Sequence, residues 1–306
     1  MTTVENLQSA FGIRSFGYWD GVMSSEQILG HAITDHRGRI EMSAYAVMVE
    51  SVTSGAFWYS FNAPVGTVQS WLSLTAAAPA DVNQRLFATS QLVYRDDMYG
   101  ALTVQITNDS QHVVCAGVGR CVRVGRTGDA LATINAATAP QSDEFMSTAG
   151  ESTSLPPPID PELDGKQILA AISGRRITAG PFCELLCPTV GLADTGVRLA
   201  VSPRPWMANP LGAMQGGVVA AIISQACSFA GQLYAGPGQK YALGDLTASF
   251  WRSPPVDIGE IAVTTMLDKL GRRIGTVSAT MTGPDDVPLA RAVADIQYGL
   301  ATRPGR

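Results

Sequence analysis

The stretch from Asn209 to Ser228, NPLGAMQGGVVAAIISQACS, joins a turn to a long apolar helix that opens on two glycines, Gly216 and Gly217. The first N–H groups of a helix have no partner within it and carry partial positive charge. They can therefore hold a carbonyl oxygen or an anion, and a glycine lets a substrate approach them closely. This helix contains no acid, base or strong nucleophile at a useful position, so the reactive group must come from elsewhere in the chain.

An acid stands alone in another long apolar run, SAYAVMVESVTSGAFWYSF, over residues 43–61. No other charged or amide side chain occurs over residues 44–49, so we expect Glu50 to be buried rather than to lie on a wet helix face. Burial disfavours the charged carboxylate and raises its pKa. Such a group can act as a general base on water or attack a carbonyl directly, and the sequence leaves both routes open. Ser54 lies one helical turn on and is expected to orient Glu50 or the water.

The two apolar runs have the same neighbours in the two halves of the chain. A shift of 174 residues places Asp35 on Asn209 and Gly38 on Gly212, so a similar turn precedes each run. Identity between the halves is weak, but the order of elements and the glycine positions agree. The sequence therefore predicts an internal duplication.

Alternating apolar and polar residues predict antiparallel strands after each run. In the second half these are ALGDLTASFWRS, GEIAVTTMLDKLG, RRIGTVSATMTGP and PLARAVADIQYG. In the first half they are LFATSQLVYRDD, GALTVQITNDS, HVVCAGVGRCVRVG and DALATINAA. The segment 93–104 is expected to correspond to 250–263, which places Tyr94-Arg95 against Trp251-Arg252 and Gly100 against Gly259.

The predicted fold class is α+β, with two copies of one unit in which a sheet wraps a long helix. We assign residues 1–138 to the N-terminal copy and 166–306 to the C-terminal copy. The Ser-, Pro- and acid-rich residues 139–165 form an extended linker. The helix over 216–234 is apolar on almost every side, which favours a buried core helix over a membrane span.

The motif NPLGAMQGGVVAA resembles the signature of hotdog-fold thioesterases of the phenylacetate-pathway (PaaI-like) type, and FWRSPPVDIGEIAV and LARAVADIQYG resemble their following strands. The family motif reads Asn-Pro-x-Gly-x-x-His-Gly-Gly, with an Asp or Glu eight residues past the first of the paired glycines. The resemblance covers most of the second half and, more faintly, the first half. It implies a tandem, or double, hotdog.

Two departures from the motif affect the implied activity. Gln215 stands in place of the family histidine, and Ser224 stands where the catalytic carboxylate is expected. The C-terminal copy alone therefore lacks the acid. The shift of 174 residues places Ser224 on Glu50 and Ser228 on Ser54, so the N-terminal copy keeps an acid at this position.

In the family the sites lie between two hotdogs, so a tandem chain has two junctions. One junction combines Glu50 and Ser54 with Asn209, Gln215 and Gly216. In this arrangement Gly216 N–H stabilises the oxyanion, while the amides of the other two residues hold the carbonyl or the water. Gly217 is assigned to substrate binding.

The other junction lacks a usable site. It combines Asp35, Glu41 and Met42 with Ser224 and Ser228. Met42 and Ser43 replace the paired glycines, and the charge of Glu41 would repel an oxyanion. The sequence therefore predicts a single composite site for each chain.

Arg272 and Arg273 follow a turn glycine, and we assign them to the phosphates of coenzyme A, although a solvated hairpin tip is the alternative. No cofactor is expected beyond the coenzyme A of the substrate. No metal site is expected, because Cys183 and Cys187 have no histidine at ligand spacing. The five cysteines follow no disulfide framework and predict reduced thiols.

The overall composition narrows the class of protein. The chain has 306 residues, 46% hydrophobic residues and a net charge of −5, which argues against nucleic acid as a partner. The polar start, MTTVENLQSAF, is not typical of a signal peptide, so we expect a cytoplasmic protein. A homo-oligomer of tandem chains is expected from the resemblance alone.

Hydrolysis of an acyl-CoA or a related acyl thioester is the function that these residues favour. The alternative is a degenerate hotdog protein that binds acyl-CoA or another apolar ligand without turnover, because Gln215 and Ser224 depart from the motif. A hydratase of the related class ranks last, since the spacing of His31 and His36 does not match its loop motif.

Overall fold

The computed structural model describes residues 6–61, 63, 65–125 and 154–299. The first half contains α1 (Leu7–Phe11), β1 (Ile13–Trp19), β2 (Val22–Ile28), α2 (Ala46–Tyr59), β3 (Gly66–Ala76), β4 (Arg85–Arg95), β5 (Tyr99–Asn108) and β6 (Val113–Val124). The second half contains α4 (Gly165–Ser173), α5 (Pro181–Leu186), β7 (Thr189–Ala193), β8 (Gly196–Val201), α6 (Gly216–Leu233), β9 (Tyr241–Phe250), β10 (Ile261–Leu270), β11 (Ile274–Thr282) and β12 (Pro288–Tyr298).

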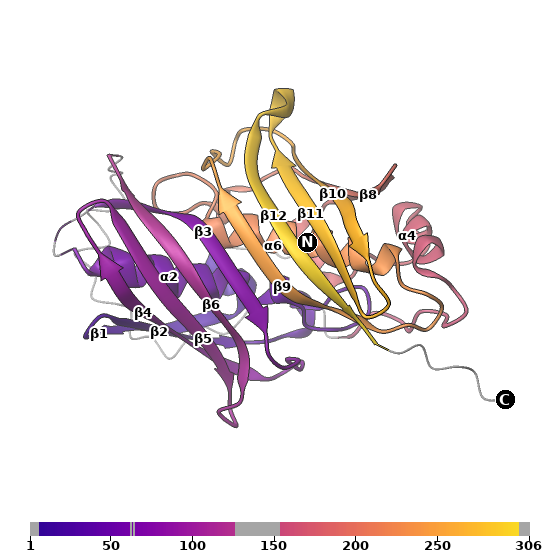
Figure 1. Cartoon of the computed structure of the whole chain (residues 1–306), viewed down its shortest axis with the longest axis horizontal. Helices are drawn as coiled ribbons and strands as arrows, with labels where there is room; N and C mark the ends of the chain where they lie inside the picture. The colour runs from indigo at the N-terminus through magenta and orange to yellow at the C-terminus, as the bar shows by residue number, and fades with distance from the viewer. Residues whose placement is uncertain (1–5, 62, 64, 126–153, 300–306) are drawn as a thin grey trace.

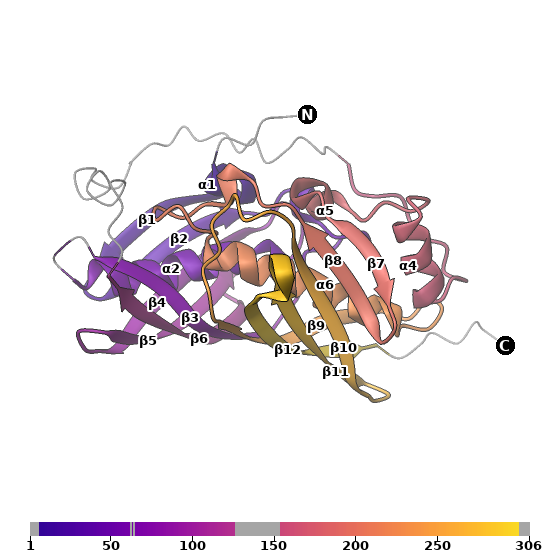
Figure 2. The ribbon, with the colours of Figure 1, turned by 90° about the horizontal axis from the view of Figure 1, so that it is seen from above.

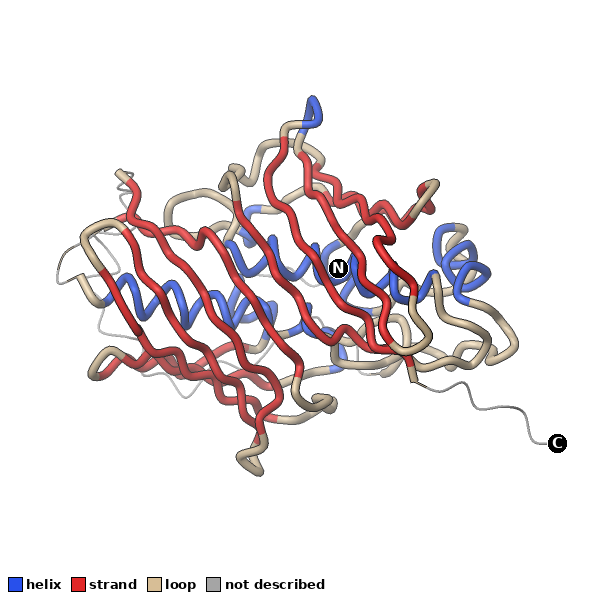
Figure 3. Tube along the Cα trace, viewed as in Figure 1, coloured by secondary structure: helices blue, strands red, loops and turns tan. Residues whose placement is uncertain are grey.

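The described strands form one antiparallel sheet of twelve strands in the order β1-β2-β4-β5-β6-β3-β9-β12-β11-β10-β8-β7. From one edge to the centre the order is β1-β2-β4-β5-β6-β3, and from the other edge it is β7-β8-β10-β11-β12-β9. In each half the third strand along the chain therefore lies innermost, so β3 and β9 meet in the middle of the sheet. The sheet curls so that α2 and α6 lie between its central strands and its edge strands (Figure 2). Seen face-on, both helices run behind the strands (Figure 3).

The pairing of β3 with β9 relates the two halves. Ser73 pairs with Thr247, and their hydroxyl oxygens are 2.8 Å apart. These residues are 174 positions apart, the same shift that aligns the two halves of the sequence. Leu74 pairs with Leu246 and Leu72 with Ala248, so pairing is symmetric about this point. An approximate twofold axis therefore passes between Ser73 and Thr247.

The turns before the two long helices share one geometry. Asn209 Oδ1 accepts hydrogen bonds from the N–H groups of residues 211 and 213, and Asp35 Oδ1 accepts them from residues 37 and 39. Gly212 and Gly38 have φ of 77° and 71°, a left-handed conformation that favours glycine. The predicted correspondence of Asp35 with Asn209 and of Gly38 with Gly212 is confirmed by this geometry.

The long helices lie in one continuous hydrophobic core. Within α6, every residue from Gly217 to Gln232 is buried. The helix is long and apolar enough to span a membrane, but 89% of it is buried inside the fold, as predicted for a core helix. The apolar run over residues 43–61 contains α2, which buries Glu50 among its apolar residues.

Several expectations about the strands need correction. Tyr94 and Arg95 end β4, whereas Trp251 and Arg252 follow β9, the counterpart of β3. Their predicted correspondence is therefore wrong, because alternation marks a strand but does not identify which strand it is. Strand β3 was not predicted as the first strand after α2, nor were the four strands that precede the long helices.

Other expectations concern the connection between the halves. The predicted strand DALATINAA and the boundary at residue 138 lie outside the described residues. Within the linker 139–165, residues 154–164 contain no helix or strand, and α4 begins at Gly165. A capping box between Asp164 and Gln167 fixes this helix start. The sequence analysis did not predict α4 or α5.

Candidate functional site

A cavity of about 640 Å³ lies where α2 meets the start of α6. Its walls come from both halves of the chain: α1, β1, β2, α2 and β3 from the first, and the loop before α6 together with the end of β9 from the second. Glu50, Ser54, Asn209, Gln215 and Gly216 all line it. Five of the residues assigned to the composite junction therefore share one cavity.

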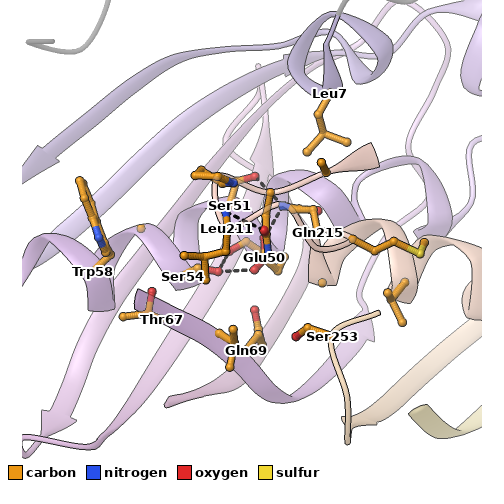
Figure 4. Close-up of a pocket in the computed structure, with 18 of the residues that line it drawn as sticks. Leu7, Glu50, Ser51, Ser54, Trp58, Thr67, Gln69, Leu211, Gln215 and Ser253 are labelled. Carbon is orange, nitrogen blue, oxygen red and sulfur yellow. Dashed lines mark hydrogen bonds between the residues drawn. The ribbon is translucent and has the colours of Figure 1, made fainter. Parts of the chain in front are cut away.

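Glu50 is the buried acid of this cavity, a residue that is 7% exposed. Ser54 Oγ donates to Glu50 Oε1, and Gln215 Nε2 donates to Oε2, so both carboxyl oxygens have a partner (Figure 4). Burial raises the pKa of Glu50 to about 7, although both donors stabilise the carboxylate and act to lower the pKa. The expected burial of Glu50 is confirmed, and burial shifts its pKa in the expected direction.

Gln215 connects the start of α6 to the carboxyl group. Its Oε1 accepts from Val218 N–H at 3.1 Å and so caps the helix. Its Nε2 donates to Glu50 and lies 3.2 Å from Ser51 Oγ. These two sets of bonds fix the orientation of the amide, so Gln215 holds the acid rather than presenting a free amide to a carbonyl or water.

The two glycines at the start of α6 differ in their surroundings. A Cβ at Gly216 would lie 3.3 Å from Glu50 Cγ and 3.5 Å from Oε1, so the predicted acid lies beside the helix start and the glycine leaves room for it. Among the described residues, no hydrogen bond engages Gly216 N–H. A Cβ at Gly217 would lie 2.6 Å from Val47 Cα. Gly217 does not line the cavity; it allows α6 to pack against the backbone of α2, which corrects its assignment to substrate binding.

Asn209 shapes the loop that forms one wall of the cavity. Its Oδ1 accepts from Leu211 N–H at 2.9 Å and from Ala213 N–H at 3.1 Å. In the part of the chain that the structure describes, its Nδ2 has no protein partner and remains available as a donor. Asn209 therefore keeps a free amide donor, as expected, whereas the amide of Gln215 is engaged by Glu50 and Ser51.

Arg272 and Arg273 lie in the turn between β10 and β11, and neither lines the cavity. Their assignment to substrate binding is not supported, and the alternative of a hairpin tip describes their position. Arg252, directly after β9, lines the cavity instead. Its segment FWRSPP was recognised in the sequence, but the pattern did not show that its arginine faces the cavity.

Sequence reasoning also missed most of the apolar wall. Trp58 and Tyr59 follow Glu50 on the same helix, and Phe16, Met23 and Trp206 come from other elements. The 3.6-residue period of α2 gave a signal for Trp58, which lies two turns from Glu50. Phe16, Met23 and Trp206 reach the cavity through tertiary packing and left no local signal.

At the mirror junction, to which Asp35, Glu41 and Ser224 were assigned, the side chain of Arg37 occupies the space between Asp35 and Glu41. Arg37 Nε donates to Asp35 Oδ2 at 2.7 Å, and Nη2 donates to Glu41 Oε1. Its guanidinium carbon lies 3.7 Å from the centre of the Tyr241 ring. Burial opposes the charge on Arg37, but the surrounding acidic groups still raise its pKa. Ser224, at the position corresponding to Glu50, is fully buried.

No family model matches the chain, and no curated protein sequence matches it. Several solved structures are similar to it. The chain superposes on a tesB protein from Mycobacterium avium subs paratuberculosis with a TM-score of 0.59 and 11% identity over 95% of this chain and 97% of that one. A putative thioesterase from Novosphingobium aromaticivorans gives 0.58 and 13% over 92% and 97%.

A third solved structure carries the name of the fold. A conserved protein of unknown function with a hot dog fold, from Alicyclobacillus acidocaldarius, gives a TM-score of 0.57 and 11% identity over 97% of this chain and 98% of that one. The likeness extends over nearly the whole length of each chain. It identifies the fold, and the expectation of a hotdog-type α+β fold is confirmed.

Proposed function

We propose that this chain, which has the hotdog fold, hydrolyses an acyl-CoA or a related acyl thioester at the cavity between α2 and α6. One observation carries the proposal: the buried Glu50 side chain lies beside Gly216 at the start of α6, inside a cavity walled by both halves of the chain. The names of similar structures support the reaction class, since one is called a putative thioesterase and another, from Mycobacterium marinum, an acyl-CoA thioesterase II TesB2.

The proposed chemistry uses the two sides of the cavity differently. A thioester carbonyl oxygen lies against Gly216 N–H, which stabilises the negative charge that grows on that oxygen. In one route, Glu50 takes a proton from water, and the hydroxide attacks the carbonyl carbon. The tetrahedral intermediate then expels the thiolate, which takes from Glu50 the proton that came from water.

In the other route, Glu50 attacks the carbonyl carbon, expels the thiolate and forms a mixed anhydride that water hydrolyses. Labelled oxygen from water distinguishes the routes in a single turnover. The anhydride route allows label to enter the Glu50 carboxyl group, whereas the general-base route places it only in the acid product.

We also propose that each chain has one working site and that the two halves arose by duplication. The single site follows from the contrast between the junctions: one offers an acid beside a helix start, whereas Arg37 fills the other. The boundaries 1–138, 139–165 and 166–306, a cytoplasmic location and assembly into a homo-oligomer belong to this proposal. In this proposal, coenzyme A takes part in the reaction as a portion of the acyl-CoA substrate.

The experiment is a screen of acyl-CoA esters read by free-thiol release, with purified native chain and Glu50→Ala. We expect the native chain to hydrolyse at least one ester. We expect the variant to lose at least about a hundredfold in kcat, the usual contribution of a general base. Circular dichroism verifies that the variant folds. Tight binding without hydrolysis across the series would favour the non-catalytic alternative, and unchanged turnover by Glu50→Ala would remove Glu50 from the mechanism.

A further inference from the structure

One arm of the cavity follows α2 away from the start of α6. The cavity-lining residues of α2 are Glu50, Ser51, Ser54, Gly55, Trp58 and Tyr59. They recur every three to four positions and so form one face of the helix. From Glu50 to Trp58 this face is about 12 Å long at 1.5 Å per residue. Figure 4 shows Glu50, Ser54 and Trp58 in succession along it.

Among the described residues that line the cavity, only Glu50 and Arg252 are charged, and Thr67 and Gln69 of β3 add uncharged polar groups to its wall. Its other walls include Phe16 from β1 and Met23 from β2, both apolar. Gly55 lets Met23 pack directly on α2, since a Cβ there would lie 3.1 Å from Met23 Cε. The arm therefore suits a narrow apolar group rather than a polar one.

Aromatic groups define the far end of the arm. Trp58 Nε1 donates to Val65 O at 2.9 Å, which fixes the indole. The neighbouring Tyr59 is the last residue of α2, and its ring stacks on Tyr18 with centroids 5.2 Å apart. Because the indole is anchored, it cannot move aside freely for a longer ligand.

Arg252 is the only charged side chain besides Glu50 among the described lining residues. It follows β9 next to Ser253, which Figure 4 shows on the side of Glu50 away from Trp58. Arg252 is exposed, so it can meet a phosphate that remains partly in water. The cavity thus has an apolar end and a cationic end, with Glu50 between them.

We infer that the acyl group of the thioester extends from Glu50 along α2 to Trp58, and that Trp58 limits the length of the acyl chain. This inference rests on the proposed function and adds the direction of the substrate. The phosphates of coenzyme A lie toward Arg252. Acyl groups of medium length fill the arm, and longer ones meet the indole.

The test compares kcat/KM of the native chain and Trp58→Ala over straight-chain acyl-CoA esters from acetyl to palmitoyl. We expect the variant to shift its preference to longer chains, with the ratio for palmitoyl over octanoyl rising at least about tenfold. Trp58→Phe should give an intermediate shift. Trp19→Ala is the matched control, because Trp19 is 80% exposed and does not line the cavity, and it should leave the ratio unchanged.

A second variant tests the direction of the substrate. Arg252→Gln should raise KM for acyl-CoA several-fold but leave KM unchanged for the matching S-acyl-N-acetylcysteamine, which has no phosphate. An equal effect on both substrates would overturn the placement of the phosphates. Hydrolysis with an unchanged chain-length profile in Trp58→Ala would overturn the role of Trp58 while leaving the proposed function intact.

Calorimetry with non-hydrolysable acyl-CoA thioethers tests the chain-length limit at Trp58 separately from the proposed hydrolysis, because it needs no turnover. A chain-length limit on affinity that moves in Trp58→Ala would support the inference even if the native chain hydrolyses nothing. An affinity that does not depend on chain length, or a limit that stays in place in Trp58→Ala, would overturn it.

Discussion

At the scale of single residues, the site depends on one carboxyl group, Glu50, whose protonated and ionised forms are both present near neutral pH. Burial raises the pKa of Glu50 to about 7, and the donors Ser54 and Gln215 act in the opposite direction. A general base works best when its pKa lies near the working pH, because it is then both ionised and basic enough to accept a proton. The surroundings of Glu50 meet that condition.

The pH dependence of the reaction tests this balance. Since Glu50 acts as a carboxylate in either route, kcat/KM should be low below the pKa and rise to a plateau as the pH increases through about 7. Ser54→Ala removes a donor that stabilises the carboxylate, so its profile should move to higher pH. Initial rates across a buffer series check both. A flat profile, or a shift to lower pH in the variant, would show that another group controls the rate.

Some residue assignments could be made from the sequence, and others could not. Glu50 was recognisable because an isolated acid in an apolar helix has few structural reasons to be there. Arg252 was not, since a cavity mouth exists only after distant segments meet. The charge of Glu41 was expected to repel an oxyanion, but it forms an ion pair with Arg37, four residues earlier in the chain. That pairing depends on the loop geometry that the turn at Asp35 imposes.

At the scale of elements, the close contact between α2 and α6 brings the two halves of the site together. Gly217 faces the α2 backbone, and Gly216 faces the Glu50 side chain. The two neighbouring glycines therefore serve different purposes: one sets the distance between helices, and the other leaves room at the reacting group. The sequence predicted both helices and the paired glycines of α6, but not this division between Gly216 and Gly217.

The pair Gly217→Ala and Gly216→Ala tests the division with the same chemical change at adjacent positions of one helix. Gly217→Ala should destabilise the fold by about 1–3 kcal/mol, because its Cβ meets the backbone of Val47 at 2.6 Å. Gly216→Ala should keep most of the stability but lower kcat by at least about tenfold through displacement of the carboxylate. Urea denaturation and free-thiol release measure the two effects. Equal effects of both substitutions on stability and rate would contradict the account.

At the scale of the whole molecule, two similar halves share one sheet and one core but have different junctions. Similar turns precede α2 and α6, yet the residues that follow them differ. Leu211 lines the cavity at one junction, while its counterpart Arg37 fills the other. The approximate symmetry was readable from the shift of 174 residues, whereas the course of the strands around it was not.

The ion-pair cluster around Arg37 should contribute to stability rather than to turnover. Arg37→Ala leaves Glu41 buried without its partner, so we expect a loss of about 3–5 kcal/mol in the free energy of unfolding. Arg198→Ala, which breaks an exposed pair with Glu260, should cost less than about 1 kcal/mol. Urea denaturation measures both values. A loss from Arg37→Ala no larger than that from Arg198→Ala would show that the filled junction is not a structural element.

The central claim is that one of two symmetry-related positions carries the chemistry. Its most direct test is acyl-CoA hydrolysis by Glu50→Gln and Ser224→Ala, two small changes at positions that correspond across the 174-residue shift. We predict that Glu50→Gln lowers kcat by at least about a hundredfold and that Ser224→Ala retains nearly native turnover. Full activity of Glu50→Gln, or equal losses in the two variants, would contradict a single site built on Glu50.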